Sequence, residues 1–179
     1  MCYICITKLK GTHRSPILLL KILTLEMHSY IQTILDEVLE DRTYFVVEIN
    51  ISDAKKRIEI FLDDENINVP ISEIAKMSRW MLNKMEEDQH PSNDYVLEVS
   101  SPGIGTPLTD KRQYKKNVDR YLEIKHDETL STGRMISFDG DNIKMEAERP
   151  KKSNKKQMEK YEINIAFDSV IESKVVVKF

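Results

Sequence analysis

The sequence predicts an α+β protein, with an N-terminal unit of helices on a three-stranded sheet and a small SH3-like or Sm-like β-barrel after it. Two observations lead to this fold class. Between residues 27 and 102, apolar residues follow helical and strand spacing in the order helix, strand, strand, helix, strand. After residue 103 the spacing is that of strands alone, and five short strands in about 60 residues favour a barrel because closure removes exposed edges.

The first helix is expected to begin at Ser29. Ser29 and Gln32 have capping-box spacing, in which the hydroxyl accepts from an amide one turn later and the glutamine reaches back to the Ser29 N–H. Apolar residues at helical spacing follow, namely Ile31, Ile34, Leu35 and Val38. Residues 1–26 lack this pattern, so we expect an extension outside the fold, with Met27 as the natural first residue.

Two strands, a helix and a third strand complete the N-terminal unit. Residues 44–51 are rich in β-branched and aromatic side chains, and residues 57–63 form the second strand after a turn. Pro70 and Ser72 open the second helix, and the third strand begins at Tyr95, with Leu97 and Val99 on its buried face. The apolar face of the second helix is expected to hold Ile74, Ala75, Ser78, Met81, Leu82 and Met85.

Asp63, Asp64 and Glu65 follow the second strand and have the hard oxygen atoms that Mg²⁺ or Ca²⁺ binds. The EF-hand spacing of ligands, with its central glycine and closing glutamate, is absent. We therefore expect a solvated acidic turn here and no metal site.

The C-terminal unit is expected over residues 103–179, with a basic loop at 149–160. A hairpin turn is expected at Asp139-Gly140 and a single helical turn at 166–171. The expected strands are Arg120–Lys125, Thr132–Phe138, Asn142–Glu146, Tyr161–Ile165 and Lys174–Lys178.

The two units meet at Ser100-Ser101-Pro102-Gly103. Pro102 has no N–H to continue a strand ladder, and Gly103 tolerates a positive φ, so the strand should stop here. Gly105 and Pro107 repeat these residue types within four positions. A joint this stiff indicates two folded units held in a defined orientation.

Charge is divided between the two units. Residues 27–102 contain seven Lys+Arg and sixteen Asp+Glu, a net charge of −9, whereas residues 103–179 contain sixteen and thirteen, a net charge of +3. An acidic half and a mildly basic half are expected to meet different partners.

Two basic clusters lie in the C-terminal half. Runs of this kind can neutralise phosphates and gain affinity by counterion release, and a solvated mobile loop is the alternative for the second cluster. The residues expected to bind RNA are Lys111, Arg112, Lys115 and Lys116, and then Arg149, Lys151, Lys152, Lys155 and Lys156. No aromatic platform or G-x-x-G loop for reading an RNA sequence is present.

No catalytic or cofactor site is predicted. Ser100 and Ser101 lack a nucleophile-elbow motif, and the histidines do not form an acid–base pair. The Cys2–Cys5 pair has no second pair to complete a metal site, and two cysteines suit a reducing cytoplasm. The apolar run at 16–25 falls short of the roughly 20 residues that span a bilayer.

The segment LEVSSPGIGTPL at 97–108 resembles the hallmark of the bacterial RimP ribosome maturation factor family, in which a strand ending in E-V-S-S-P-G leads into an R-P-L-type hinge. Many members have an Asp-Arg pair where this chain has Gly105-Thr106, which puts a contact by that arginine in doubt. The hinge residues are Glu98, Val99, Ser100, Ser101, Pro102, Gly103, Gly105, Pro107 and Leu108.

The resemblance implies an α+β domain followed by a β-barrel, and a non-enzymatic factor that binds the small ribosomal subunit during its maturation. Family members contact a small-subunit ribosomal protein near the decoding region and nearby ribosomal RNA. We expect a monomeric, cytoplasmic assembly factor without cofactors and without membrane attachment. The alternative is a stand-alone RNA-binding regulator of the Sm-like type, which would form a ring.

Overall fold

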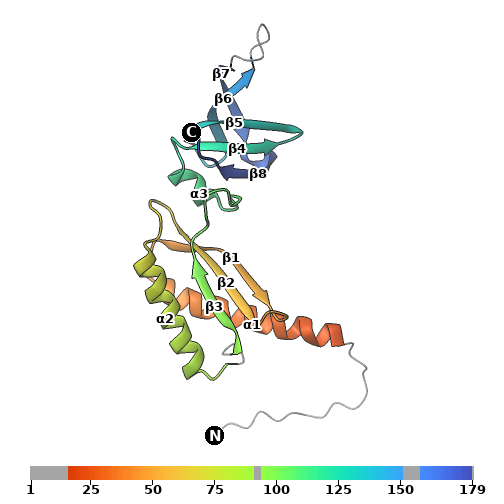
Figure 1. Cartoon of the computed structure of the whole chain (residues 1–179), viewed down its shortest axis with the longest axis vertical. Helices are drawn as coiled ribbons and strands as arrows, with labels where there is room; N and C mark the ends of the chain where they lie inside the picture. Colours follow the sequence, from red (N-terminus) through yellow and green to blue (C-terminus); the bar gives the residue numbers. More distant parts are fainter. Residues whose placement is uncertain (1–15, 91–93, 151–157, 179) are drawn as a thin grey trace.

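The computed structural model describes residues 16–90, 94–150 and 158–178. Figure 1 shows an N-terminal unit of two helices and three strands and a C-terminal unit of five strands, with a short helix between them. The elements are α1 (Pro16–Leu39), β1 (Tyr44–Ser52), β2 (Arg57–Asp64), α2 (Ile71–Glu87), β3 (Val96–Ser100), α3 (Lys111–Lys116), β4 (Tyr121–His126), β5 (Thr129–Phe138), β6 (Asn142–Pro150), β7 (Met158–Ala166), the 3₁₀ turn η2 (Phe167–Ser169) and β8 (Val170–Val175).

The N-terminal sheet has the order β1-β2-β3, with β1 antiparallel and β3 parallel to the central strand. Helices α1 and α2 pack on one face of it (Figure 1). Ile58, Ile60 and Leu62 of β2 alternate toward that face and are fully buried. The predicted α+β class and the order helix, strand, strand, helix, strand are therefore confirmed.

The predicted start of the first helix is wrong. Helix α1 begins at Pro16 and runs through Ser29, whose carbonyl accepts a hydrogen bond from the Thr33 hydroxyl at 2.9 Å. Gln32 donates to Asp36 at 2.8 Å and does not reach back to Ser29. Neither glycine nor proline lies between residues 17 and 28, so nothing local stops the helix there. The residues expected to form an extension thus include the first turns of α1, while residues 1–15 lie outside the described part of the chain.

Helix α2 buries a stripe of methionines. Met77, Met81 and Met85 are at most 1% exposed, whereas Leu82 is 43% exposed. The predicted face included the exposed Leu82 and missed the buried Met77. Met side chains adapt to an irregular surface, and this suits the packing of α2 on a twisted sheet.

The acidic end of β2 is buried, so the expected solvated turn is wrong for two of its three residues. Asp63 and Asp64 are 3% and 2% exposed. The Asp64 carboxylate accepts from the Thr43 hydroxyl and from the amides of Asn66 at 2.7 Å and Ile67 at 3.0 Å. This aspartate closes the loop that leads to α2, as Asx turns do.

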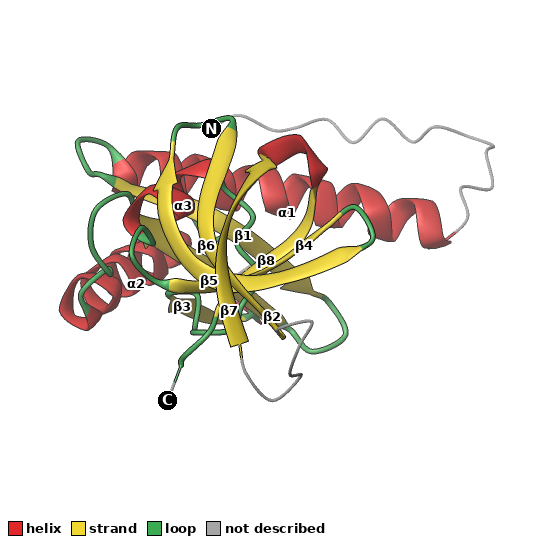
Figure 2. Ribbon diagram, turned by 90° about the horizontal axis from the view of Figure 1, so that it is seen from above, coloured by secondary structure: helices red, strands yellow, loops and turns green. Residues whose placement is uncertain are grey.

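The C-terminal sheet has the order β7-β6-β5-β4-β8, and all its pairs are antiparallel. Figure 2 shows that it is strongly curved. The pairings among the described strands run from β7 to β8 without closing, so the barrel remains a prediction. The hairpin at Asp139-Gly140 and the helical turn before the last strand are confirmed, but that strand is Val170–Val175 and begins four residues earlier than predicted.

A second apolar core lies inside the C-terminal sheet and has no buried residue in common with the first. Tyr114 of α3 is 1% exposed at its centre, with the rings of Phe138 and Phe167 each 5.3 Å from its own. Burial raises the pKa of the Tyr114 hydroxyl, which bonds Ser173 of β8. The short helix α3 is thereby anchored in the C-terminal core.

Gly133 allows β5 and β6 to approach each other. A Cβ added at this position would lie 2.2 Å from the carbonyl oxygen of Glu146 and 2.6 Å from the Cα of Ala147. Because both are backbone atoms, Gly133→Ala should force the strands apart and destabilise the protein by about 1–3 kcal/mol. Urea unfolding measures this. Gly103→Ala, whose Cβ would meet only the Thr106 hydroxyl at 3.8 Å, is the control and should unfold like wild type.

Asp64 should make stability depend on pH. Burial works to raise its pKa, but the bonds from Thr43 and from two amides, with Lys116 nearby, together lower it. A lowered pKa in the folded state stabilises the protein above the unfolded value of about 3.9, and this stabilisation is lost as pH falls through the folded pKa. Asp64→Asn should therefore destabilise the protein at pH 7, and the difference from wild type should shrink below about pH 4. A difference in unfolding free energy that stays constant over this range would contradict the assignment.

Candidate functional site

The hinge segment joins β3 to β8. After β3 ends at Ser100, the Thr106 amide donates to the Gly103 carbonyl at 3.1 Å, and the Leu108 amide donates to the Ser173 carbonyl of β8 at 2.7 Å. Gly105 has a φ of 88°, which only glycine adopts without strain. Gly103 does not have a positive φ, so the backbone conformation expected for it from the sequence is wrong. The turn needs its glycine two positions later.

Helix α3 follows the hinge and begins with a capping box. The Asp110 side chain accepts from the Arg112 amide at 2.8 Å, and the Gln113 side chain accepts from the Thr109 and Asp110 amides at 2.9 and 3.1 Å. Hydrogen bonds from Arg112 are the largest cause of the lowered pKa of Asp110. This helix was not predicted from the sequence, although the spacing of Asp110 and Gln113 is the signal that identifies it.

Helix α3 contacts the end of β2 through Asp63. The Gln113 amide donates to Asp63 Oδ2 at 3.0 Å, and the Lys116 ammonium pairs with Oδ1. The side chains of Lys116 and Asp63 are 10% and 5% exposed. A carboxylate from the N-terminal unit is therefore enclosed by two donors from the C-terminal unit.

A second contact lies beside the first. The Arg112 guanidinium is 3.8 Å from the centre of the Phe45 ring, at the start of β1. Arg112 also pairs with Asp110 at 2.7 Å, which holds the guanidinium against the ring. Together with Asp63, these residues make a clamp between the two units, defined here as Phe45, Asp63, Arg112, Gln113 and Lys116.

Two pockets flank the hinge. One, of about 320 Å³, lies between the loop before α2, the hinge and α3, and Asn68, Pro102 and Arg120 are among its lining residues. The other, of about 350 Å³, lies between β1 and Pro107. Among the hinge residues, Ser101, Gly103, Gly105 and Pro107 are exposed. Glu98 is also exposed and forms an ion pair with Arg57 of β2.

The four predicted basic residues of α3 do not form one surface. Arg112 and Lys116 belong to the clamp and face the N-terminal unit. Lys111 and Lys115 are exposed on α3, with Lys111 4.8 Å from the ring centre of Phe167. The structure thus divides the first basic cluster into an internal pair and an external pair.

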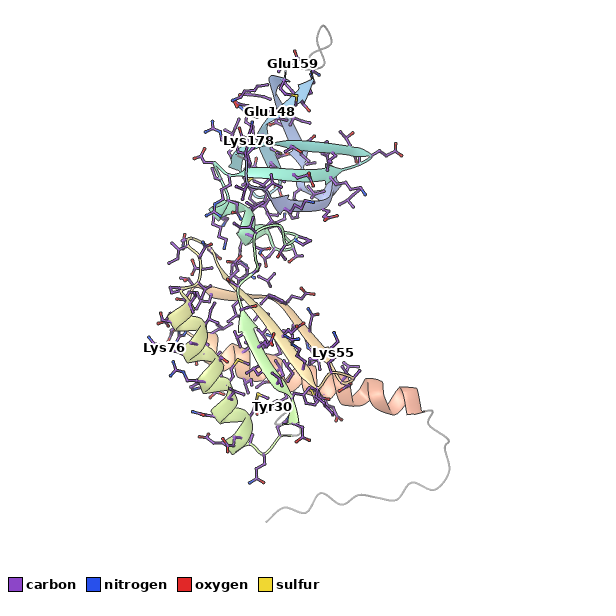
Figure 3. The ribbon with its side chains drawn as sticks, in the orientation of Figure 1. Tyr30, Lys55, Lys76, Glu148, Glu159 and Lys178 are labelled. Carbon is purple, nitrogen blue, oxygen red and sulfur yellow. The ribbon has the colours of Figure 1, made fainter. Side chains whose placement is uncertain are left out.

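The second basic cluster is only partly described. Arg149 pairs with Glu159 at 2.7 Å across the base of the loop and lies 4.8 Å from the ring centre of Tyr161, and Figure 3 marks Glu159 at that end of the sheet. Lys151, Lys152, Lys155 and Lys156 lie outside the described residues.

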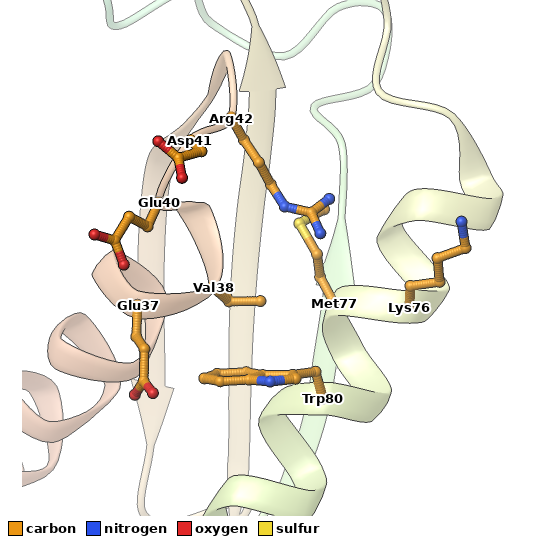
Figure 4. A pocket seen from close by; sticks show the side chains of 8 residues that line it. All are labelled: Glu37, Val38, Glu40, Asp41, Arg42, Lys76, Met77 and Trp80. Atoms are coloured by element: carbon orange, nitrogen blue, oxygen red, sulfur yellow. The ribbon is translucent and has the colours of Figure 1, made fainter.

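A further pocket, of about 460 Å³, lies between the C-terminal end of α1 and the middle of α2. Figure 4 shows the indole of Trp80 reaching from α2 toward α1, with Val38 and Met77 above its plane. The lining residues also include Glu37, Glu40, Asp41, Arg42 and Lys76. This pocket was not predicted from the sequence, because its residues come from two helices and a turn whose packing no local pattern encodes.

No group of three or more His, Cys, Asp or Glu among the described residues could hold a metal ion. His126 bonds Ser131 at 2.9 Å, and His90 stacks on Tyr30 at 3.8 Å. Burial is the main cause of the lowered pKa of His90 and the largest cause that raises the pKa of Tyr30 to about 12. Over the part of the chain that the structure describes, we find no helix long and apolar enough to cross a membrane.

Comparison with known proteins identifies the family. Residues 34–105 match the model of the RimP N-terminal domain. A ribosome maturation factor RimP from Christiangramia forsetii is 29% identical over 143 residues, which cover 78% of this chain and 90% of the relative. Its counterparts from Flavobacterium psychrophilum and Cytophaga hutchinsonii are 32% and 33% identical, over 75% and 74% of this chain and 86% and 81% of their own lengths. With identity above 30% over more than four fifths of two relatives, the chain belongs to the RimP ribosome maturation factor family.

Proposed function

We propose that this protein is a non-catalytic ribosome maturation factor that binds the small ribosomal subunit while the subunit is assembled. The observation that carries the proposal is a −9 unit fixed to a +3 unit by a buried clamp. A ribosomal subunit presents basic proteins beside RNA phosphates. One rigid body with an acidic and a basic side can meet both at once, which a flexible pair of units does less well.

In this proposal, the N-terminal unit, residues 27–102, acts as one acidic domain that binds a ribosomal protein. Ribosomal proteins are strongly basic, so this domain attracts one of them electrostatically and speeds encounter. The second domain, residues 103–179, is proposed to be the SH3-like barrel. The separate apolar cores of the two units support this division.

In this proposal, the C-terminal unit provides a basic surface for ribosomal RNA. Lys111 and Lys115 are its described members on α3, and the exposed Arg120 lies near them in sequence. Lys151, Lys152, Lys155 and Lys156 would extend this surface. Arg112 and Lys116 are left out because the clamp occupies them.

The described strands leave β7 at one edge of the C-terminal sheet, whereas the hinge bonds to β8 at the other edge. An Sm-like ring would use such an edge to join neighbouring copies. This is the observation in favour of a stand-alone RNA-binding regulator. The family relationship favours the assembly factor, which we propose to be a monomer of the cytoplasm. Gel filtration distinguishes the monomer from the ring, because a ring elutes with an apparent mass that is a multiple of 20.9 kDa.

Binding to the subunit is tested by sedimentation of purified small subunits with the protein through a sucrose gradient. We expect the protein to sediment with small subunits and not with large subunits, and less so as salt rises, because binding to phosphates releases counterions. Replacing Lys111 and Lys115 with glutamine should flatten the dependence on salt by roughly 0.7–0.9 in log–log slope for each phosphate that the variant no longer neutralises. Equal sedimentation with both subunits would contradict the proposal.

The clamp is tested by Asp63→Asn and Lys116→Met, separately and together. Each single variant leaves a buried group without its charged partner, so it should destabilise the protein by up to about 3 kcal/mol, and the double variant should recover part of this stability. Urea unfolding measures the unfolding free energies of the double-mutant cycle. Small-angle scattering should show larger dimensions for the single variants than for wild type, and these variants should bind the subunit more weakly. Pro102→Gly is the comparison. It alters the hinge and leaves the clamp intact, so unchanged dimensions are expected, and loosening by Pro102→Gly alone would show that the hinge sets the orientation.

A further inference from the structure

The pocket between α1 and α2 combines an aromatic floor with uncompensated negative charge. Met77 and Val38 are 1% and 8% exposed at its base, and Trp80 is half-buried beside them. An indole that packs against buried aliphatic groups and keeps part of its surface open is typical of an anchor point at a protein interface.

The charges on the two sides of the pocket differ. On the α2 side, Arg42 and Lys76 both pair with Glu73, at 3.0 and 2.7 Å. On the α1 side, Glu37, Glu40 and Asp41 are exposed, and none of them has an ion pair with a described residue. Figure 4 shows these three side chains on the α1 side and the Arg42 guanidinium turned toward α2.

The acidic side is held in place by the end of the helix. Asp41 has a φ of 63°, a left-handed conformation that ends α1, and the Arg42 amide bonds the Leu39 carbonyl at 3.0 Å. The acidic residues at the end of α1 thus line the α1 side of the pocket, and the C-terminal end of a helix adds partial negative charge to theirs.

We propose that this pocket receives an arginine or lysine side chain from a basic protein segment of the small subunit. The cation would lie over the Trp80 ring and pair with the carboxylates of α1. Trp gives the strongest cation–π contact, and guanidinium is the cation that best combines stacking with bidentate pairing. Three uncompensated carboxylates repel phosphate, so the same surface is unsuited to RNA. This inference rests on the proposed function and names the site on the acidic unit that meets the protein partner.

The test uses two variants with the same change of charge. Glu37→Gln, Glu40→Gln and Asp41→Asn together remove the acidic side of the pocket. Glu86→Gln, Glu87→Gln and Asp94→Asn together form the control, since these exposed residues have no side-chain bond to a described residue and do not line the pocket. All substitutions are on exposed side chains, so both variants should unfold at the wild-type urea midpoint.

The first probe is a short peptide of alternating arginine and glycine. Trp80 is the single tryptophan of the chain, so its fluorescence reports on this pocket alone. The peptide should change the emission of wild type and of the control, with at least about tenfold weaker binding by the pocket variant and less than about threefold by the control. Equally weakened binding by both variants would overturn the proposal, because general attraction to an acidic surface would then explain the binding.

The second probe is the purified small subunit, sedimented with each variant. The pocket variant should bind at least about tenfold more weakly than wild type, and the control should bind like wild type. Binding by the pocket variant equal to wild type would overturn this inference and leave the proposed function intact. Absence of binding by wild type would overturn the proposed function.

The ring itself is tested by Trp80→Phe and Trp80→Leu, with a fluorescein-labelled peptide read by anisotropy. Phenylalanine keeps an aromatic face and leucine does not, so affinity should fall in the order Trp, Phe, Leu. Equal affinity of the Leu variant and wild type would overturn the proposed stacking.

Discussion

The arrangement of this protein depends on one buried carboxylate. Asp63 is the last residue but one of the central strand of the N-terminal sheet, and Gln113 and Lys116 reach it from the first helix of the other unit. A buried charge is tolerated only where donors surround it, so this residue is stable only when the two units lie in one orientation. The chain thereby uses an electrostatic requirement to fix geometry, which apolar contact alone does less specifically.

The sequence predicted the fold wherever the pattern was local. Period-2 alternation located every strand, but the bounds of β5, β6, β7 and β8 differ from the prediction by three or four residues at one end or both. The hinge motif identified the joint and the family. It failed where a tertiary contact decides the outcome. Asp63 and Asp64 are in a run of charged residues that looks solvated, and only the approach of α3 and the loop before α2 makes them buried.

The same reason explains the fate of the predicted site residues. Lys111, Arg112, Lys115 and Lys116 are one basic run in the sequence, yet the helix turns alternate members toward the N-terminal unit and toward solvent. Charge counting detects such a run but does not assign its faces, and here the unrecognised capping box at Asp110 was the missing information. The pocket at Trp80 was likewise invisible, because α1, α2 and the turn between α1 and β1 supply its sides.

The bond from Leu108 to Ser173 of β8 determines when the joint can form during synthesis. The hinge is translated some 65 residues before the strand that receives it, an interval set by those two positions. Contacts between segments this far apart in the chain form late, since loop closure must precede them. While the chain grows, the N-terminal unit can fold as soon as β3 has emerged, whereas the hinge stays undocked until residues 170–175 have left the exit tunnel. A nascent chain therefore passes through an interval in which its acidic half is folded and the orientation between the halves is not yet set.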